Sequence, residues 1–356
     1  MQALFVGTLD GVFKVIRSKQ GWEIRLRDLA GLEVNALAIH PAQRHVIYAG
    51  VRGGGLYRSH DGGGTDWQPL GVGVLSDKIR ALALDPADSE IVYVGTEPPA
   101  LWKSEDGGVT WKEIVGVAKL AKERKWNYPV PVIQPHIRSI AIDPSNSKKI
   151  CLAAQVGGVL LSEDGGESWR DVRYPIDMDV HCVSFDPGSG ATLYAATGSG
   201  ENFPGPTTPP KGRPLYRSRD GGKSWESISD TLSRTYAVPV RVHPTNSQLL
   251  YLGVAEGPPP FWLDRPTKAN GALMRSADGG ASWQQLAGGF PSPFESMVEC
   301  IEFDPDAPDT VILGTGGEGA RYIKLDKGEI FRSINRGDSW EKIPLNFPIV
   351  YALAVQ

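Results

Sequence analysis

The stretch SEDGGVTW, residues 104–111, returns almost unchanged as SEDGGESW at residues 162–169. Four further stretches resemble it: SHDGGGTDW (59–67), SRDGGKSW (218–225), SADGGASW (276–283) and SINRGDSW (333–340). The tryptophans that end these stretches lie 44 to 58 residues apart, so each stretch belongs to a much larger unit. A repeat of this period indicates either repeated chemistry or repeated architecture, and the two possibilities predict different functions.

Residues 79–114 show the unit in its shortest form. The segments IRALALDP, IVYVGT, LWKSEDGG and TWKEI follow one another, each rich in Val, Ile, Leu or aromatic residues and bounded by Gly, Pro or Asp. Such segments predict strands joined by tight turns, and therefore a four-stranded antiparallel meander. The first strand of this meander ends at a proline and recurs at residues 34–41, 79–86, 137–144, 180–187, 238–244 and 298–305.

The two ends of the chain hold complementary parts of one more unit. Residues 2–26 match the second, third and fourth strands without a first, and residues 349–356 match a first strand with nothing after it. Pairing these ends removes two free sheet edges. We therefore expect an all-β fold, a seven-bladed β-propeller of four-stranded antiparallel blades, closed by the C-terminal strand joining the N-terminal blade, with residues 1–356 as a single domain.

Within the repeated stretch, every residue type has a local structural use. Asp106 can accept hydrogen bonds from nearby backbone N–H groups, the glycines permit a tight turn, and Trp111 can cover the hairpin. The N-terminal unit has SKQGW (18–22) without the aspartate, and the last complete unit has Asn335 in its place. A turn tolerates such changes and a repeated active site does not. We therefore interpret the repeated stretch as a structural turn and expect the functional residues in other parts of the chain.

This pattern resembles the Asp-box, or BNR repeat, of sialidases, xyloglucanases, sortilin-type receptors and photosystem II assembly factors. The resemblance covers nearly the whole chain and implies a propeller. It says little about activity, because proteins of unrelated function share the box.

Composition narrows the classes of partner. The chain has 356 residues, 41% of them hydrophobic, and a formal net charge of −4, which disfavours nucleic acid as a partner. No apolar run is long enough to span a membrane, and the N-terminus lacks the features of a signal peptide, so we expect a cytoplasmic monomer. Cys151, Cys182 and Cys300 lie in strand-like runs, which indicates buried thiols rather than disulfides or a metal site; we expect no metal and no cofactor.

The long insertions all fall on one face of the expected propeller, at residues 115–135, 198–214, 255–272 and 316–328. Long loops on a rigid scaffold usually carry function. The innermost strand of each blade begins at this face, so the residues six positions before its proline are expected to line the channel mouth. They are Asn35, Arg80, Arg138, His181, Val238 and Glu299, and Tyr351 is their counterpart in the closing strand.

An apolar layer is expected below this mostly polar ring. The next residues of the same parity are Leu37, Leu82, Ile140, Val183, Val240, Ile301 and Leu353. Adding nearby strand ends and insertions gives candidate ligand-binding residues Asn35, Arg52, Arg80, Arg138, His181, Glu299, Tyr351, Trp126 and Trp262. Candidate catalytic groups are Glu97, Glu201, Glu256, Glu299, Glu318 and Tyr351.

Three functions compete. The first is a non-catalytic propeller that binds a polar, carbohydrate-like or acidic ligand, a glycan or a protein at the mouth, as the resemblance to assembly factors implies. The second is a glycoside hydrolase, sialidase-like or glucanase-like, with paired carboxylates as acid and base. Against it, sialidases are six-bladed with an Arg-Ile-Pro signature absent here, and the resembling xyloglucanases use two propellers. The third is a metal-dependent enzyme using His136 and His181, but the other histidines lie on the opposite face.

The ring arginines give a sharper expectation. Arg80 and Arg138 belong to consecutive blades, so we expect them to be neighbours at the mouth and to face solvent. Glu97 can neutralise one guanidinium, which leaves the other for an anionic ligand. The competing arrangement is a closed arginine–glutamate network that braces the blades.

Overall fold

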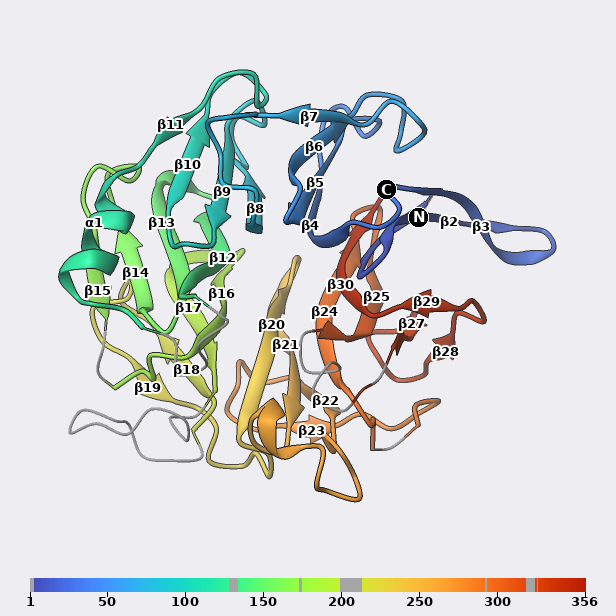
Figure 1. Cartoon of the computed structure of the whole chain (residues 1–356). Helices are drawn as coiled ribbons and strands as arrows, with labels where there is room; N and C mark the ends of the chain where they lie inside the picture. The colour runs from blue at the N-terminus through green and yellow to red at the C-terminus, as the bar shows by residue number, and fades with distance from the viewer. Residues whose placement is uncertain are drawn as a thin grey trace.

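The computed structural model describes residues 3–127, 134–172, 175–198, 213–291, 293–317, 324 and 326–356. Within them the regular secondary structure is almost entirely β-strand, with sheets arranged in a ring around a common centre (Figure 1). The described helices are α1 (Gly116–Glu123), which lies in an insertion between two sheets, and the short 3-10 helix η1 (Pro259–Phe261). None of the helices in the described ranges is long and apolar enough to cross a membrane.

Five four-stranded antiparallel sheets follow one another along the chain. The first contains β4 (Glu33–Ile39), β5 (Ile47–Arg52), β6 (Gly55–Ser59) and β7 (Gln68–Leu70). The second contains β8 (Ile79–Leu84), β9 (Val92–Thr96), β10 (Leu101–Ser104) and β11 (Lys112–Glu113). The third contains β12 (His136–Asp143), β13 (Asn146–Gln155), β14 (Gly158–Ser162) and β15 (Arg170–Val172).

The fourth sheet contains β16 (Val180–Asp186), β17 (Ser189–Thr197), β18 (Leu215–Ser218) and β19 (Glu226–Ser227). The fifth contains β20 (Tyr236–His243), β21 (Asn246–Ala255), β22 (Ala272–Ser276) and β23 (Gln284–Gln285). A separate two-stranded sheet pairs β26 (Lys327–Gly328) with β29 (Phe347–Pro348). In each four-stranded sheet the first strand in sequence is the one nearest the centre of the ring (Figure 1).

The remaining strands form one eight-stranded sheet with two parts. One part contains β24 (Met297–Asp304), β25 (Ala307–Gly316), β27 (Ile330–Ser333) and β28 (Glu341–Lys342). The other contains β30 (Val350–Val355), β1 (Leu4–Thr8), β2 (Gly11–Ser18) and β3 (Gly21–Asp28). The parts meet at a single parallel pair, Gly316 with Val350. The predicted pairing of the terminal strands is present, because β30 runs antiparallel to β1 from Val355 opposite Leu4 to Val350 opposite Thr8.

Apolar side chains fill the spaces between neighbouring sheets. Tyr48 and Leu56 of the first sheet pack with Ile79 and Val94 of the second, and comparable clusters join each following pair. Two further clusters flank the strands at the chain ends, one with β24 and β25 and one with β4 and β5. Each sheet therefore buries apolar residues against both of its neighbours, which is where most of the stabilising free energy arises.

The repeated stretches form the turns between the third and fourth strands, as predicted. Ser104 Oγ accepts a hydrogen bond from the Gly108 N–H at 2.7 Å and donates to Asp106 Oδ1. Asp106 Oδ1 also accepts from the Thr110 N–H at 2.8 Å, and the Trp111 indole donates to the Gly108 carbonyl at 2.9 Å. The box aspartate therefore satisfies backbone donors within its own turn.

These turns predict an acid limit to stability. The carboxyl pKa is lowered to about 2 at each of four box aspartates, Asp106, Asp164, Asp220 and Asp278. The largest cause is a hydrogen bond donated by a nearby side-chain hydroxyl, that of Thr110, Ser168, Ser224 or Ser282 respectively. Each pKa lies below the unfolded value of about 3.9, so the contribution is present above pH 4 and is lost as the pH falls toward 2. Changing all four residues to Asn should flatten that acid limb in pH-dependent melts. Asn is chosen because Asn335 already accepts a backbone hydrogen bond in the corresponding turn. If the variant lost stability toward low pH as steeply as the wild type, the box carboxylates would not be the cause of the acid limit.

Candidate functional site

The innermost strands β4, β8, β12, β16, β20, β24 and β30 surround a cavity of about 470 Å³. All seven residues that the sequence places at the channel mouth line it: Asn35, Arg80, Arg138, His181, Val238, Glu299 and Tyr351. Five residues of the expected apolar layer also line it, namely Leu37, Leu82, Ile140, Val183 and Leu353. A mixed polar ring thus stands beside an apolar wall, an arrangement typical of small ligand sites.

A β-bulge presents each mouth residue to the cavity. In β12 the pairing with β13 passes from Ile137 directly to Ser139, so Arg138 is the extra residue. The same shift occurs at Asn35, Arg80, His181 and Glu299, at Val238–Pro239, and at Tyr351 in the closing strand. Bulges re-aim side chains and are common beside functional sites. The recurrence at one level explains how residues from seven strands converge on a single ring.

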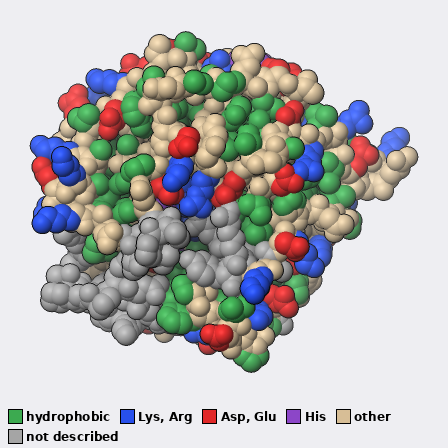
Figure 2. All heavy atoms as spheres, viewed as in Figure 1, with side chains coloured by type: hydrophobic (Ala, Val, Ile, Leu, Met, Phe, Trp, Pro, Cys, Tyr) green, Lys and Arg blue, Asp and Glu red, His purple; other side chains and the backbone are tan. Residues whose placement is uncertain are grey.

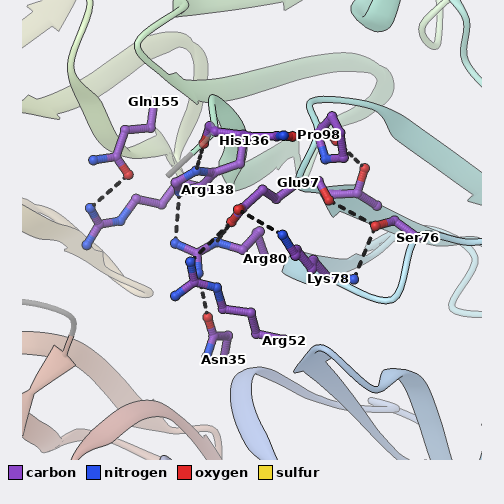
Figure 3. A network of polar contacts seen from close by, with 12 residues as sticks. Asn35, Arg52, Ser76, Lys78, Arg80, Glu97, Pro98, His136, Arg138 and Gln155 are labelled. Carbon is purple, nitrogen blue, oxygen red and sulfur yellow. Dashed lines mark hydrogen bonds and ion pairs between the residues drawn. The ribbon is translucent and has the colours of Figure 1, made fainter. Parts of the chain in front are cut away.

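One half of the ring is held by the carboxylate of Glu97 at the end of β9. Arg52, Lys78 and Arg80 converge on it, with N–O distances of 3.6, 3.5 and 3.8 Å (Figure 3). Arg80 also donates to Asn35 Oδ1 at 2.9 Å and to His136 Nε2 at 2.9 Å. The side chains of Glu97 and Arg80 are 0% and 4% exposed, so the expectation that Arg80 faces solvent is wrong.

The other arginine of the ring is also engaged. Arg138 donates to Gln155 Oε1 at 3.2 Å and, across the cavity, to Glu299 Oε1 at 3.1 Å. The expectation of a second guanidinium left without a carboxylate is therefore wrong. The structure contains the competing arrangement, in which arginine–glutamate pairs connect blades that are separate in sequence.

The histidine of the ring belongs to a buried polar cluster. His181 Nδ1 lies 2.6 Å from the Ala237 carbonyl, and its Nε2 lies 3.2 Å from both Asp179 Oδ1 and the Tyr236 hydroxyl. Burial opposes ionisation of Asp179, but the charges of His181 and Arg138 outweigh it, so the pKa of Asp179 is lowered. The ring of Trp262 packs edge-on against Tyr236.

Trp262 does not form an aromatic wall, contrary to expectation. Its side chain is fully buried and its indole donates to the Gly257 carbonyl at 2.9 Å. Trp126 packs in the apolar cluster beside α1 and against Gly157, and it is not among the residues that line the cavity. Both tryptophans therefore support insertions instead of contacting a ligand, because a large apolar ring is more stable inside a loop than in solvent.

The candidate carboxylates separate in the structure. Glu299 lines the cavity and Glu97 lies behind the ring, whereas the half-exposed side chain of Glu256 bonds to Asn270 within its own insertion. Glu201 and Glu318 lie outside the described residues, as do parts of the insertions that contain them. Among the described candidates, no two carboxylates face each other across the cavity wall as an acid and base pair.

Sequence reasoning missed a second charged pair deeper in the cavity. Arg241 of β20 and Glu302 of β24 line it, and their N–O distance is 3.5 Å. Burial raises the pKa of Glu302, and the Arg241 guanidinium offsets this only in part. The available signal was the position three residues before the turn proline, where the earlier repeats have Ala38, Ala83, Ala141 and Ser184.

The cavity carries charges of both signs, with one more arginine than glutamate in its lining. Arg80, Arg138 and Arg241 line the cavity together with Glu299 and Glu302. Figure 2 shows basic and acidic side chains side by side near the middle of this face. Within the described ranges, no three His, Cys, Asp or Glu side chains gather in a way that suits a metal ion.

The sequence is similar to a known protein family and to characterised enzymes. The sequence model of a family described as "Sortilin, neurotensin receptor 3" matches residues 99–236. An oligoxyloglucan-reducing end-specific xyloglucanase from Emericella nidulans is 23% identical over 242 residues, 57% of this chain and 26% of that enzyme. The match thus spans about a quarter of the length of this curated relative. The chain resembles the Asp-box propellers.

Two solved structures show the same propeller fold. The GH74 xyloglucanase from Xanthomonas campestris has a TM-score of 0.62 at 20% identity, and the match covers 87% of this propeller but 45% of that chain. YCF48 bound to D1 peptide has a TM-score of 0.57 at 17% identity, and the match covers 94% of this propeller and 90% of that chain. This chain therefore corresponds in extent to the second structure and to part of the first.

Proposed function

We propose that this chain is a non-catalytic binding propeller whose cavity mouth receives a polypeptide segment of a protein partner. The observation that carries the proposal is the correspondence over nearly the whole of both chains with YCF48 bound to D1 peptide. The xyloglucanase structure extends far beyond the matched region. A similar fold shared over full length is a better guide to the kind of task than one shared over part of a larger enzyme.

The chemistry of the mouth supports this proposal. A polypeptide presents backbone N–H and C=O groups together with charged side chains, so its recognition needs donors and acceptors in one ring. Asn35, Arg138, Glu299 and Tyr351 supply both kinds of group around the cavity. Arg138 and Glu299 hold each other in place, and Asn35 accepts a hydrogen bond from Arg80, which lowers the entropic cost of binding.

A second candidate function is glycoside hydrolysis, favoured by the similarity to xyloglucanases over 57% of the chain. Such enzymes need one carboxyl group as acid and another as base or nucleophile on either side of the scissile bond. Glu299 lines the cavity but is paired with Arg138 at 3.1 Å, which favours its charged form and suits a brace better than a general acid.

The proposed architecture is a single domain over residues 1–356 with seven blades, the last formed by residues 2–26 and 349–356. It is supported by the pairing of β1 with β30 and by the apolar clusters between each pair of neighbouring four-strand sets. We also propose a cytoplasmic monomer without a nucleic acid partner, and the net charge of −4 supports the latter point.

The test uses octapeptides selected from a random library on the wild-type protein. We expect the double variant Arg138→Gln with Glu299→Gln to bind these peptides at least tenfold more weakly in fluorescence anisotropy. Changing both members of the pair avoids leaving a lone buried charge, so the melting temperature should change little. Glu341→Gln, which removes an exposed pair with Arg332, is the matched control. Failure to enrich any peptide, together with release of sugar from xyloglucan oligosaccharides, would favour the hydrolase.

A further inference from the structure

Beneath the mouth, small side chains leave room in the cavity. At the position three residues before the turn proline, Ala141 and Ser184 line the wall, whereas Arg241 and Glu302 project from the two neighbouring strands β20 and β24. Their side chains are 33% and 34% exposed, although they lie inside the ring. Two long charged groups therefore share a level of the cavity at which Ala141 and Ser184 present small side chains.

The contacts of this pair are long. Arg241 reaches Glu302 Oε1 at 3.5 Å, Cys182 Sγ at 3.3 Å and the Val240 carbonyl at 3.3 Å. Charge-assisted hydrogen bonds are usually about 2.7–2.9 Å, and the surface pair of Arg332 with Glu341 has such a distance, 2.9 Å. Unlike the fully buried Glu97, whose contacts are also 3.5–3.8 Å long, both of these side chains are about one-third exposed, so each has room for a further partner.

The carboxylate of Glu302 has the greater capacity for a further hydrogen-bond donor. In the described part of the chain, Arg241 is the polar partner of Glu302 and contacts one of its two oxygens. Burial raises the pKa of Glu302 in spite of Arg241, so a further cation beside it would be favourable. An anion beside Arg241 would then restore neutrality.

We propose that Arg241 and Glu302 bind a free amino acid with an apolar side chain, such as leucine. The ligand's ammonium donates to Glu302 and its carboxylate accepts from Arg241. A net-neutral pair favours a zwitterion over a simple anion or cation, because each charge of the ligand meets an opposite one. The apolar side chain lies against Ile142 and Phe185, which line the same cavity, and 470 Å³ is within the range of about 300–1,000 Å³ for small-molecule sites.

The inference does not rest on the proposed function, because the site lies below the ring that receives the peptide. Its first test compares L-leucine with 4-methylpentanoate, which lacks the ammonium, and with isopentylamine, which lacks the carboxylate. Calorimetric titration of the wild-type protein should show binding of leucine and at least tenfold weaker binding of each analogue. Equal affinity for all three probes, or no binding of leucine at millimolar concentration, would overturn the proposal.

Variants assign the site. Glu302→Gln keeps the shape of the side chain and should weaken leucine binding at least tenfold, whereas the surface control Glu341→Gln should leave it unchanged. The combination of Glu302→Gln with Arg241→Met removes both charges together, so it tests the pair even if Arg241→Met alone fails to fold. Unaltered leucine binding in a folded Glu302→Gln protein would refute the assignment.

The two sites are distinguished by crossing the probes. The double variant of Arg138 and Glu299 should lose the selected octapeptides and keep leucine, and Glu302→Gln should show the reverse. Loss of both ligands in each variant with an unchanged melting temperature would mean one continuous site, and would contradict a separate amino acid site.

Discussion

Removal of residues 349–356 is expected to destabilise the protein by about 5–8 kcal/mol, which is comparable to the whole stability of an ordinary domain. These residues form β30, whose ladder with β1 would be lost. Val350 and Leu353 are 0% and 3% exposed, and burying each such side chain contributes about 1.5–3 kcal/mol. The deletion also exposes β1 as a new sheet edge, so association should accompany the loss of stability.

Urea denaturation and size-exclusion chromatography of the truncated chain provide the measurement. A synthetic peptide of residues 349–356 added in trans should restore part of the stability, because the missing strand can pair with β1 as a separate molecule. If the truncated chain melts at the wild-type temperature and remains monomeric, the terminal strands do not close the ring and the seven-bladed architecture is wrong.

The second large effect is expected at Glu97. Its side chain is fully buried and is the shared carboxylate partner of Arg52, Lys78 and Arg80. Glu97→Gln removes the charge of Glu97 from beside the buried Arg80 guanidinium, and breaking a buried pair in this way costs about 3–5 kcal/mol. For a chain of this length that corresponds to a fall of about 5 °C in melting temperature.

The control is Glu341→Gln, because Glu341 pairs with Arg332 at 2.9 Å but has a side chain that is 44% exposed. That exposed pair should contribute at most about 1 kcal/mol. A similar small effect at Glu97 would mean that solvent reaches the three cations in solution. The network would then be a surface feature and not the brace that the structure indicates.

Much of the fold could be predicted because its signals are local. Turn residues, apolar alternation and a box at a regular spacing define each strand within a few residues of where it lies. The mouth residues were found by counting back from the turn proline, and the count worked because each inner strand carries its bulge at the same place. This count identifies the mouth residues although no residue pattern in the sequence indicates the bulge.

The partners of those residues could not be predicted, because they are far apart in the chain. Arg138 and Glu299 are separated by 161 positions, and no local pattern connects them. Arg241 and Glu302 were missed for a different reason. Counting every second residue from the mouth gives Val240 and Ile301, which do not line the cavity, and so passes over Arg241 and Glu302.

The bulges have a consequence for how this scaffold can change. An extra residue in an inner strand has no opposite residue in the ladder, so its replacement alters neither register nor the pairing of its neighbours. Such positions recur in the seven strands around the cavity. At each of them the side chain can differ while the backbone pairing of the strand stays the same. A library that varies Val238 and Tyr351 could therefore be screened for new specificities, whereas Asn35 and His181 also hold the buried side chains of Arg80 and Asp179.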